Sequence, residues 1–343
     1  MKLKQVQETA GAIFDEAGVA LSFNNDHEAL DAVNQGVAIC DRSHWGLLKI
    51  TGEDRLRYLH NQSTNDFEKL MPGQGCDTVF VTSTARTLDL ATAYVTEDAV
   101  LILVSPNRRQ QLLTWLDRFI FPFDKVELTD ISAESSIFSL IGNQSSTLLS
   151  QLVSETIPQK NLAAHLLVTI ADVPVRVAMG SGLATPGYTL IMPPENAGIV
   201  WSKLIEQGSV PLGDRLWESL RIQQGRPIPD RELTEDYNPL EAGLWQTISF
   251  EKGCYIGQET IARLNTYKGV KQKLWGIKLN QSVAPETPIT IEDKKVGTLT
   301  SYTDTPDGGY GLGYVRTKAG DEGLKVQIGD AEGILVAPPF LTM

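Results

Sequence analysis

The chain has 343 residues, of which 42% are hydrophobic and 21% are charged, and its net charge is −12. This length and composition predict two or three domains with a sizeable buried core. The negative charge disfavours broad nucleic-acid binding, because phosphates require a positive protein surface. No apolar run is as long as a membrane span, and the N-terminal MKLKQ lacks the apolar core of a signal peptide, so we expect a cytoplasmic protein with no membrane contact.

The first two thirds of the chain alternate predicted strands and helices. A strand is predicted at 46–50, and a helix through Leu56 and Leu59 follows, with Glu53 and Asp54 suiting the dipole of its first turn. The apolar run 100–104 predicts a second strand. After it, leucines and a phenylalanine recur at helical spacing, at Leu112, Leu113, Leu116 and Phe119.

The same strand, break and helix pattern returns 88 positions later. Residues 188–192 form its strand, and the apolar stripe of its helix consists of Val200, Trp201, Leu204 and Ile205. Equal element lengths at one offset predict two related subdomains. A further helix is predicted from Leu212 to Gln224, ended by Gly225.

The predicted secondary structure changes in character after Lys271. Short β-rich runs are separated by turn residues such as those at 307–309, and these runs are 274–279, 295–300 and 311–315. Regular short strands without helices predict a small antiparallel barrel or sandwich. We therefore expect one domain over residues 1–270, made of two related subdomains, and a β-barrel domain over residues 271–343.

The segment 250–259, FEKGCYIGQE, combines a cysteine, a lysine, two glycines and an amide–acid pair within ten residues. Cys254 lies just before a predicted helix and two residues after Lys252, and both features favour a thiolate. Gly253 and Gly257 permit close approach to a ligand or to another strand. The alternative is a tight loop whose cysteine is a small buried apolar residue.

Metal-ligand and disulfide patterns are missing from the sequence. Cys40, Cys76 and Cys254 lie far apart with no Cys-x-x-Cys pair, and the four histidines have no ligand spacing. We expect neither a disulfide framework nor a metal site. A window from Thr260 to Pro285 contains no acidic residue but holds Arg263, Lys268, Lys271, Lys273 and Lys278. It either faces an anionic ligand, such as a carboxylate tail or a phosphate, or forms a solvated strand face.

Five ordered blocks resemble the YgfZ family of folate-binding proteins, which are relatives of the glycine-cleavage T-protein, an aminomethyltransferase. The strongest is 252–259, KGCYIGQE, which looks like the signature of the YgfZ branch, whereas T-proteins lack this cysteine. The other blocks are 41–52, 58–66, 220–227 and 239–244. The resemblance covers nearly the whole chain.

The resemblance implies an α+β fold in which two swapped ferredoxin-like subdomains bind folate. A C-terminal antiparallel β-barrel closes a three-lobed ring. The implied cofactor is tetrahydrofolate or another reduced folate, bound between the subdomains.

The resemblance also implies the site residues. Trp45 and Trp217 fall on positions associated with folate, where an indole stacks on a pterin and donates its N–H. From the residues alone, core tryptophans are the favoured interpretation of both. Cys254, Lys252 and Asp89 are the implied reacting groups. The remaining implied folate contacts are Gln223, Tyr255, Gly257, Gln258, Glu259 and Arg263.

Two departures from the T-protein pattern bear on the chemistry. T-proteins have a Gly-Gly-x-x-Asp-Asp turn, whereas here Ala85 and Arg86 replace the glycines, and only Asp89 of the acidic pair remains, which predicts a reshaped turn. Gln223 stands where T-proteins have a glutamate, and an amide lacks the charge-assisted bond of a carboxylate.

The implied function is support of iron–sulfur cluster assembly or repair in client proteins such as tRNA-modifying enzymes. We expect an accessory factor more than a turnover enzyme, with no direct nucleic-acid partner. One rival is a folate-dependent aminomethyltransferase, which Asp89 favours. A second rival is an interaction scaffold that has lost its ligand, which Gln223 favours.

Overall fold

A computed structural model describes residues 2–342, so the outer ends of the two predicted domains, Met1 and Met343, lie outside the described residues. The chain packs as two compact units. The first contains the chain up to Tyr58 together with Glu68–Asp77 and Ala91–Glu218. The second contains Leu59–Phe67, Thr78–Leu90 and the chain from Ser219 onward. The predicted division at residues 270 and 271 stays a prediction.

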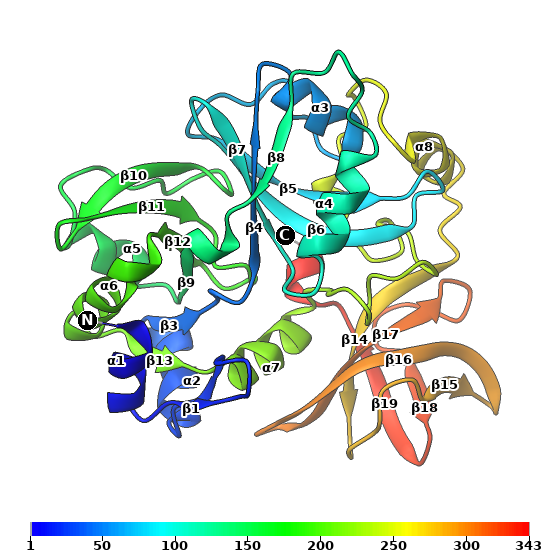
Figure 1. Ribbon diagram of the computed structural model, residues 1–343. Helices are drawn as coiled ribbons and strands as arrows, with labels where there is room; N and C mark the ends of the chain where they lie inside the picture. The colour runs from blue at the N-terminus through cyan, green and yellow to red at the C-terminus, as the bar shows by residue number, and fades with distance from the viewer. Residues whose placement is uncertain (1, 343) are drawn as a thin grey trace. The chain divides into compact units, whose positions relative to one another are not determined.

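One sheet has the strand order β5-β6-β7-β4-β8 (Figure 1). This sheet contains a βαββαβ unit, formed in chain order by β4, α3, β6, β7, α4 and β8. The four strands of the unit have the spatial order β6-β7-β4-β8, which is the ferredoxin-like arrangement. The elements are β4 (Gly46–Thr51), α3 (Arg55–Gln62), β5 (Gly75–Val81), β6 (Thr87–Val95), β7 (Ala99–Val104), α4 (Arg109–Asp117) and β8 (Glu127–Asp130).

A second sheet has the order β10-β11-β12-β9-β3-β13 and repeats the βαββαβ pattern with β9, α5, β11, β12, α6 and β13. The early strand β3 is inserted in it, antiparallel to β9 and parallel to β13. Its elements are β3 (Ala38–Asp41), β9 (Ser136–Ile141), α5 (Ser145–Ser150), β10 (His165–Ile170), β11 (Val173–Met179), β12 (Gly187–Met192), α6 (Ala197–Glu206) and β13 (Val210–Leu212).

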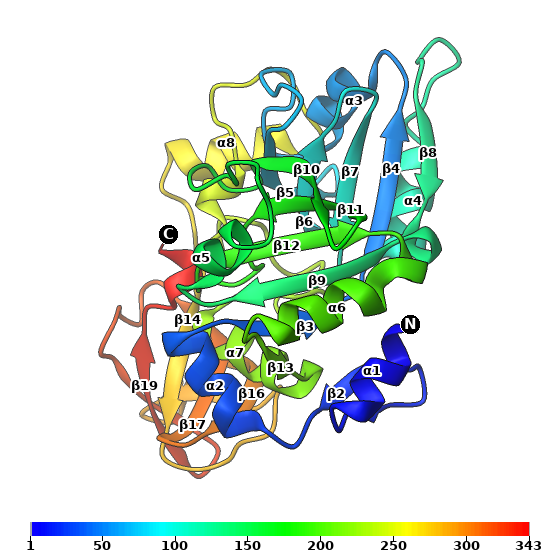
Figure 2. The ribbon, with the colours of Figure 1, turned by 90° about the vertical axis from the view of Figure 1, so that its left-hand side faces the viewer.

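The predicted repeat corresponds to equivalent elements of the two sheets. The strand and helix predicted from 100–119 are β7 and α4, and those predicted 88 positions later are β12 and α6. Helix α6 lies against the second sheet, beside β9 (Figure 2). Its Val200, Trp201 and Leu204 are buried in one apolar cluster with Phe138 and Leu190 of that sheet. This amphipathic stripe is why the sequence forms a helix that packs on a sheet.

Short elements precede these sheets, and α7 follows them. They are α1 (Leu3–Thr9), β1 (Ile13–Phe14), β2 (Ala20–Ser22), α2 (Asp26–Gln35) and α7 (Asp214–Gln224), with 3-10 turns at Ser132–Glu134, Pro194–Asn196, Trp245–Thr247 and Pro339–Leu341. The prediction that the helix ending at Gln224 begins at Leu212 is wrong, because Leu212 ends β13 beside Cys40 of β3 and α7 begins at Asp214. The helix does end before Gly225, whose φ of 87° matches the predicted stop.

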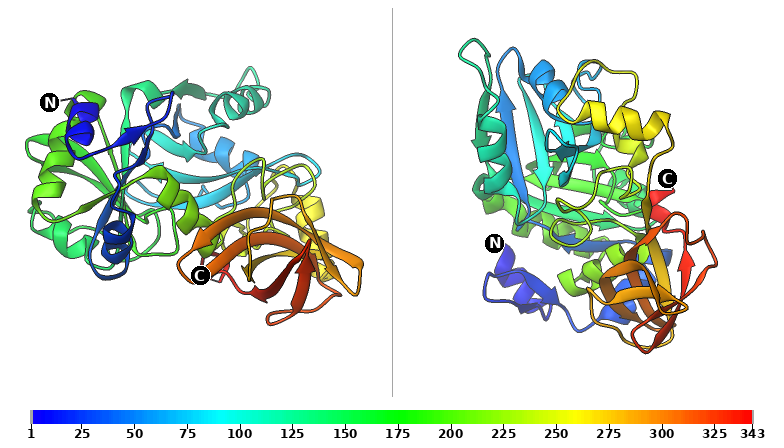
Figure 3. Two further views of the ribbon diagram at one scale, coloured as in Figure 1. Left: turned by 90° about the horizontal axis from the view of Figure 1, so that it is seen from below. Right: turned by 90° about the vertical axis from the view of Figure 1, so that its right-hand side faces the viewer.

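The C-terminal strands close into a six-stranded antiparallel barrel of order β14-β17-β16-β15-β18-β19, which confirms the predicted fold class (Figure 3). Trp275, Ile277, Leu299, Val315 and Leu335 fill its interior. The strands are β14 (Gln272–Leu279), β15 (Pro288–Ile291), β16 (Lys294–Thr305), β17 (Gly308–Arg316), β18 (Lys325–Ile328) and β19 (Ala331–Val336), and helix α8 (Gln258–Thr266) precedes them. No helix within residues 2–342 has an apolar stretch long enough to cross a lipid bilayer.

Candidate functional site

The first unit brings Trp45 and Trp217 together. Their rings are 5.5 Å apart between centroids and meet edge to face at 80°. Both indoles are buried, with 3% and 4% of their surfaces exposed. The Nε1–H of Trp217 is a buried donor with no hydrogen-bond partner in the part of the chain that the structure describes. Buried donors are normally paired, so this N–H is a candidate contact for a ligand acceptor.

Arg42 organises this tryptophan pair. Its guanidinium carbon lies 3.7 Å from the centroid of Trp45 and 5.0 Å from that of Trp217. Its Nη1 donates to Ser139 Oγ at 3.0 Å and to the carbonyl oxygen of Ser181 at 3.2 Å. A face of Trp45 is therefore covered by a cation.

A glycine makes room for this guanidinium. A Cβ added to Gly182 would lie 2.4 Å from Nη1 of Arg42. Gly182 also has a φ of 83°, in the left-handed region that favours glycine.

Titratable groups surround the tryptophan pair on the same loop and helix. The imidazole Nε2 of His44 lies 3.6 Å from Oδ1 of Asp214 on α7. Burial lowers the pKa of His44, against the pull of Asp214, and burial likewise raises the pKa of Asp214. Both shifts disfavour the charged forms. Cys40 is buried here, and its pKa is raised well above the usual value by burial and then by Asp214.

In the second unit, Gln223 is half-buried near the end of α7. Its Nε2 donates to Ser219 Oγ, one turn earlier, at 3.1 Å. Ser219 Oγ in turn accepts a bond of 2.9 Å from Thr303 of β16. The amide is thus held by a hydroxyl pair, one member of which belongs to the barrel.

Lys252 of the signature segment is buried, with 7% of its surface exposed. Its ammonium donates to the backbone oxygens of His60, Ser63 (2.8 Å) and Asn65 (2.6 Å). The ammonium group has three N–H donors, and the three carbonyl oxygens accept from all of them, so the hydrogen-bonding capacity of the side chain is fully used. The lysine thereby clamps the signature segment onto the 60–65 turn. Its predicted role beside Cys254 stays a prediction.

Two backbone bonds complete this clamp. Ile256 N donates to the oxygen of Asn61 at 3.0 Å, and Ser249 N donates to that of Thr64 at 3.0 Å. His60 within the clamped turn pairs its Nδ1 with Asp66 Oδ1 at 3.1 Å. A Cβ added to Gly253 would lie 3.6 Å from His60 Nε2, so the backbone next to Cys254 passes beside the imidazole.

Gly257 places the end of the signature against the turn that carries the T-protein-like sequence. A Cβ at Gly257 would lie 2.8 Å from the oxygen of Thr82 and 3.1 Å from the Cα of Ala85. Gly257 has a φ of 81° and directly precedes α8, which confirms the helix expected there. Ala85 keeps a left-handed φ of 61°, a conformation that glycine adopts more readily.

The other predicted folate contacts of the signature fall into two groups. Tyr255 is buried in an apolar cluster with Ala85, Leu240 and Ile261, and burial raises its pKa to about 12. Gln258 is half-buried at the start of α8, whereas Glu259 and Arg263 are exposed. Tyr255 therefore acts in packing, and the exposed residues are free of the core.

Asp89 is completely buried on β6, between Leu88 and Leu90. A general acid or base must reach the substrate atom with which it exchanges a proton. The burial of Asp89 within a strand therefore weighs against its predicted role at folate.

The three cysteines differ in exposure. Cys254 is exposed, Cys76 is half-buried and Cys40 is buried. Within residues 2–342, no three His, Cys, Asp or Glu side chains gather closely enough to hold a metal ion. The expected reactivity order, with Cys254 first, stays a prediction.

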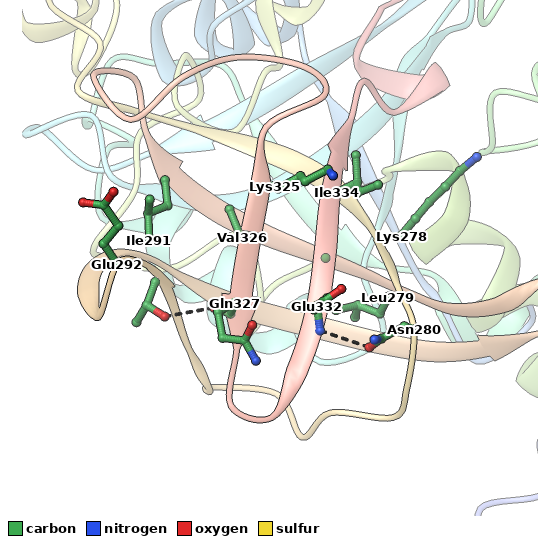
Figure 4. Close-up of a pocket in the computed structure, with 12 residues that line it drawn as sticks. Lys278, Leu279, Asn280, Ile291, Glu292, Lys325, Val326, Gln327, Glu332 and Ile334 are labelled. Carbon is green, nitrogen blue, oxygen red and sulfur yellow. Dashed lines mark hydrogen bonds between the residues drawn. The ribbon is translucent and has the colours of Figure 1, made fainter.

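The barrel wall carries a cavity of about 550 Å³ (Figure 4). Lys278 and Asn280 of the β14 end, Glu292 after β15, Lys325 of β18 and Glu332 of β19 line it, with Ile334 beside them. Lys278 belongs to the basic window, but no residue predicted to contact folate lines this cavity.

The structure thus joins the predicted residues in separate groups. Trp45 and Trp217 meet in the first unit, while Lys252, Tyr255 and Gly257 fix the position of the Cys254 segment in the second. The roles of Arg42, Ser219 and the His60–Asp66 pair were not predicted. Arg42 lies three residues before Trp45 within a block already singled out, whereas Ser219 and Thr303 carry no sequence signal.

Comparisons with known proteins place these groups in a family. The model of the GCVT N-terminal domain matches residues 9–252. A chloroplastic protein of Arabidopsis thaliana that is named as a transferase is 45% identical over 335 residues, covering 97% of this chain and 78% of that protein. An aminomethyltransferase of Halalkalibacterium halodurans is 27% identical over 348 residues, covering 98% of this chain and 94% of its own.

A solved structure supports the fold. The crystal structure of the glycine cleavage system aminomethyltransferase T from Bartonella henselae superposes with a TM-score of 0.84 at 20% identity, covering 99% of this chain and 98% of that one. The match of the family model to most of the chain, together with the Arabidopsis relative, shows that the chain belongs to the GCVT N-terminal domain family.

Proposed function

We propose that this protein binds a reduced folate and that, through Cys254, it supports the assembly or repair of iron–sulfur clusters in client proteins, such as tRNA-modifying enzymes. The proposal places it in the cytoplasm. The observation that carries the folate part is the buried Trp217 Nε1–H, which has no partner among the described residues, next to Trp45.

A pterin fits one feature of this cluster and not another. Its ring nitrogens and carbonyl oxygen offer acceptors to the Trp217 N–H. The face of Trp45 under Arg42 does not fit stacking, because the guanidinium already lies 3.7 Å from that ring. The residues of the first unit therefore support edge recognition through Trp217. A reduced folate would supply one-carbon chemistry when bound.

A titration tests the folate part. Addition of 5-formyltetrahydrofolate should quench tryptophan fluorescence, and Trp217→Phe should remove most of the quenching and weaken binding. Trp45→Phe should reduce the quenching with a smaller loss of affinity. Trp115→Phe is the control, because Trp115 contacts Phe119 instead of this pair. Unchanged binding by the Trp217→Phe variant would place folate elsewhere.

The exposed Cys254 supports the iron–sulfur part. The buried Lys252 clamp and the packed Gly257 hold the segment on either side of this thiol, so the cysteine is presented from a fixed backbone. An accessible thiolate binds sulfur or iron transiently, whereas a stable cluster needs several thiolates. Cys254→Ser should abolish support of iron–sulfur enzymes in cells that lack the native gene. Cys76→Ser should retain that support. If both variants support the iron–sulfur enzymes equally, the hypothesis of an interaction scaffold is favoured instead.

An aminomethyltransferase is the second candidate function. The 27% identity with the Halalkalibacterium halodurans aminomethyltransferase over almost the whole chain favours it. Leu90 in place of the second acid and the burial of Asp89 oppose it. Formation of methylene-tetrahydrofolate from an aminomethyl donor, lost in Asp89→Asn, would establish this activity.

A further inference from the structure

The outer wall of the C-terminal barrel presents two rows of side chains to the cavity of about 550 Å³ (Figure 4). In the first row, strand pairing places Ile334 opposite Lys278 on one side and opposite Lys325 on the other. In the second row, Glu332 lies opposite Gln327. All five side chains are exposed, and alternate residues of a strand point to the same face. The two rows therefore border one continuous surface.

This surface carries charges of both signs that are not paired with each other. Figure 4 shows Lys278 and Glu292 at opposite sides of the cavity, with Lys325 and Glu332 between them. None of these four charged groups forms an ion pair or a hydrogen bond within residues 2–342. Lys325 and Glu332 are diagonal neighbours on adjacent strands, about 7–8 Å apart between Cα atoms. Their ammonium and carboxylate are therefore both available to a ligand that carries both charges.

Two amides beside these charges are oriented by hydrogen bonds. Asn280 Oδ1 accepts from the backbone N–H of Glu332 at 3.0 Å, which leaves the NH₂ group of Asn280 as a donor. Gln327 Nε2 donates to the oxygen of Gly329 at 3.0 Å, which leaves its Oε1 as an acceptor. Both amides line the cavity. A small number of placed polar groups of this kind fixes the orientation of a small molecule in its site.

An apolar surface lies between the charges. Ile334 is 43% exposed, although its neighbours on both adjacent strands are lysines. Leu279 and Val326, which belong to the apolar interior of the barrel, also border the cavity. Covering such a surface removes apolar area from water. The cavity therefore suits a ligand that has an aliphatic group next to its charged groups.

We propose that this cavity binds a small zwitterion of the α-amino-acid type with an aliphatic side chain. Its carboxylate accepts from Lys325, its ammonium donates to Glu332, and its side chain covers Ile334. The volume of about 550 Å³ lies within the range of small-molecule sites, roughly 300–1,000 Å³. A simple anion would face the two glutamates and a simple cation the two lysines, whereas a zwitterion complements both signs. No residue predicted to contact folate lines the cavity, so the inference is independent of the proposed function.

The test uses the full-length protein without folate and three ligands that share one carbon skeleton. L-leucine has both charges, isocaproate lacks the ammonium, and isoamylamine lacks the carboxylate. Isothermal titration should show that L-leucine binds at least about tenfold more tightly than either analogue, since each analogue loses a charge-assisted hydrogen bond. Equal binding of L-leucine and isocaproate, or no binding of L-leucine, would overturn the inference.

Two single variants separate the roles of the charges. Lys325→Met should weaken L-leucine binding roughly tenfold and make isoamylamine bind as well as L-leucine. Glu332→Gln should weaken L-leucine binding by the same factor and make isocaproate bind as well as L-leucine. Lys318→Met and Glu286→Gln are the matched controls, because both residues are exposed and neither lines the cavity. The same change of selectivity in both variants, or an equal loss of affinity in a control, contradicts the assignment of the charges.

Nuclear magnetic resonance locates the bound ligand. The methyl resonances of Ile334 and the amide resonances of β18 and β19 should shift on addition of L-leucine, and Lys325→Met should remove these shifts at the same ligand concentration. The changed side chain is exposed, so the variant should keep a wild-type spectrum without ligand, which shows that it folds. Shifts confined to residues outside the barrel would place the amino acid elsewhere and refute the inference.

Discussion

Each unit contains a buried cation that organises a candidate functional region, and the two cations do so in different ways. Arg42 places its guanidinium over the ring of Trp45 in the first unit, whereas Lys252 donates from its ammonium to three backbone carbonyls in the second. A planar guanidinium stacks on aromatic faces, and a compact ammonium suits acceptors that converge on a point. The comparison shows that these two positive charges are not interchangeable, although both are hidden from solvent.

Glycines serve both regions by allowing close approach. Gly182 leaves space for the guanidinium of Arg42, and Gly257 lets the signature segment touch the 82–85 turn. In each case a backbone without a Cβ is placed against a group whose position matters for the site. In each unit, the buried cation and the glycine therefore act together to fix the local structure of the candidate region.

The largest expected effect is that of Lys252→Met. The change leaves three carbonyls of the 60–65 turn without their donor, so it should cost at least about 3 kcal/mol of unfolding free energy. Lys252→Arg should not restore the loss, because a planar fork cannot replace a point donor. Urea unfolding measures the effect, with the exposed Lys268→Met as the control. If the Lys252→Met variant is as stable as the control, the hydrogen bonds of Lys252 do not stabilise the protein, and the comparison with Arg42 fails.

Gly257→Ala should cost about 2 kcal/mol, from a left-handed backbone and a crowded Cβ together. Gly323→Ala is its matched control, because Gly323 has a φ of 83° with nothing within 4 Å of its added Cβ. The control should lose only about 1 kcal/mol, the cost of the backbone conformation. Thermal unfolding of both variants separates the two terms, and equal losses would mean that contact with the 82–85 turn contributes nothing.

Arg42→Lys should lower stability by about 1.5 kcal/mol, since it keeps the charge but loses the stacked plane and a hydrogen bond. The fluorescence of Trp45 and Trp217 should shift, because their environment changes. Urea unfolding monitored by fluorescence gives both values. If Arg42→Lys matches the wild type in both, the guanidinium plane has no special role and the contrast with Lys252 fails.

The smallest effect on stability is expected for Cys254→Ser, within about 0.5 kcal/mol, because the side chain is exposed and similar in size. The thiols themselves should differ strongly. Cys254 should react with iodoacetamide first, Cys76 next and Cys40 last, because Cys40 is buried and its pKa is raised. Mass spectrometry of a time course at pH 8 gives the order, and faster labelling of Cys40 than of Cys254 would contradict it.

Much of the fold was predictable from local patterns. The repeat of a strand and an amphipathic helix identified β7 with α4 and β12 with α6, because burial of one face imposes the helical period. The short strands after Lys271, separated by turn residues, likewise predicted the barrel from a local pattern. The start of α7 was missed, since the pairing of Leu212 with Cys40 joins residues far apart in the sequence.

The candidate site was predictable only in part. The sequence singled out the signature around Cys254 and the two tryptophans. It did not predict that Lys252 donates to backbone carbonyls or that Asp89 is completely buried. Neither burial nor the direction of a long side chain follows from spacing. A lysine beside a cysteine in sequence donates here to carbonyls some 190 positions away, as the separation of Lys252 and Ser63 shows.

The sequence by itself determined most of the strands and helices, the short β-strands that follow Lys271, and the motif that carries the exposed cysteine. These properties depend on periodicity, turn residues and glycine, which act over a few neighbouring positions. Only the tertiary structure decided that Arg42 covers Trp45 and that Lys252 clamps a turn. Those contacts join distant segments, and their geometry exists only once the chain has packed.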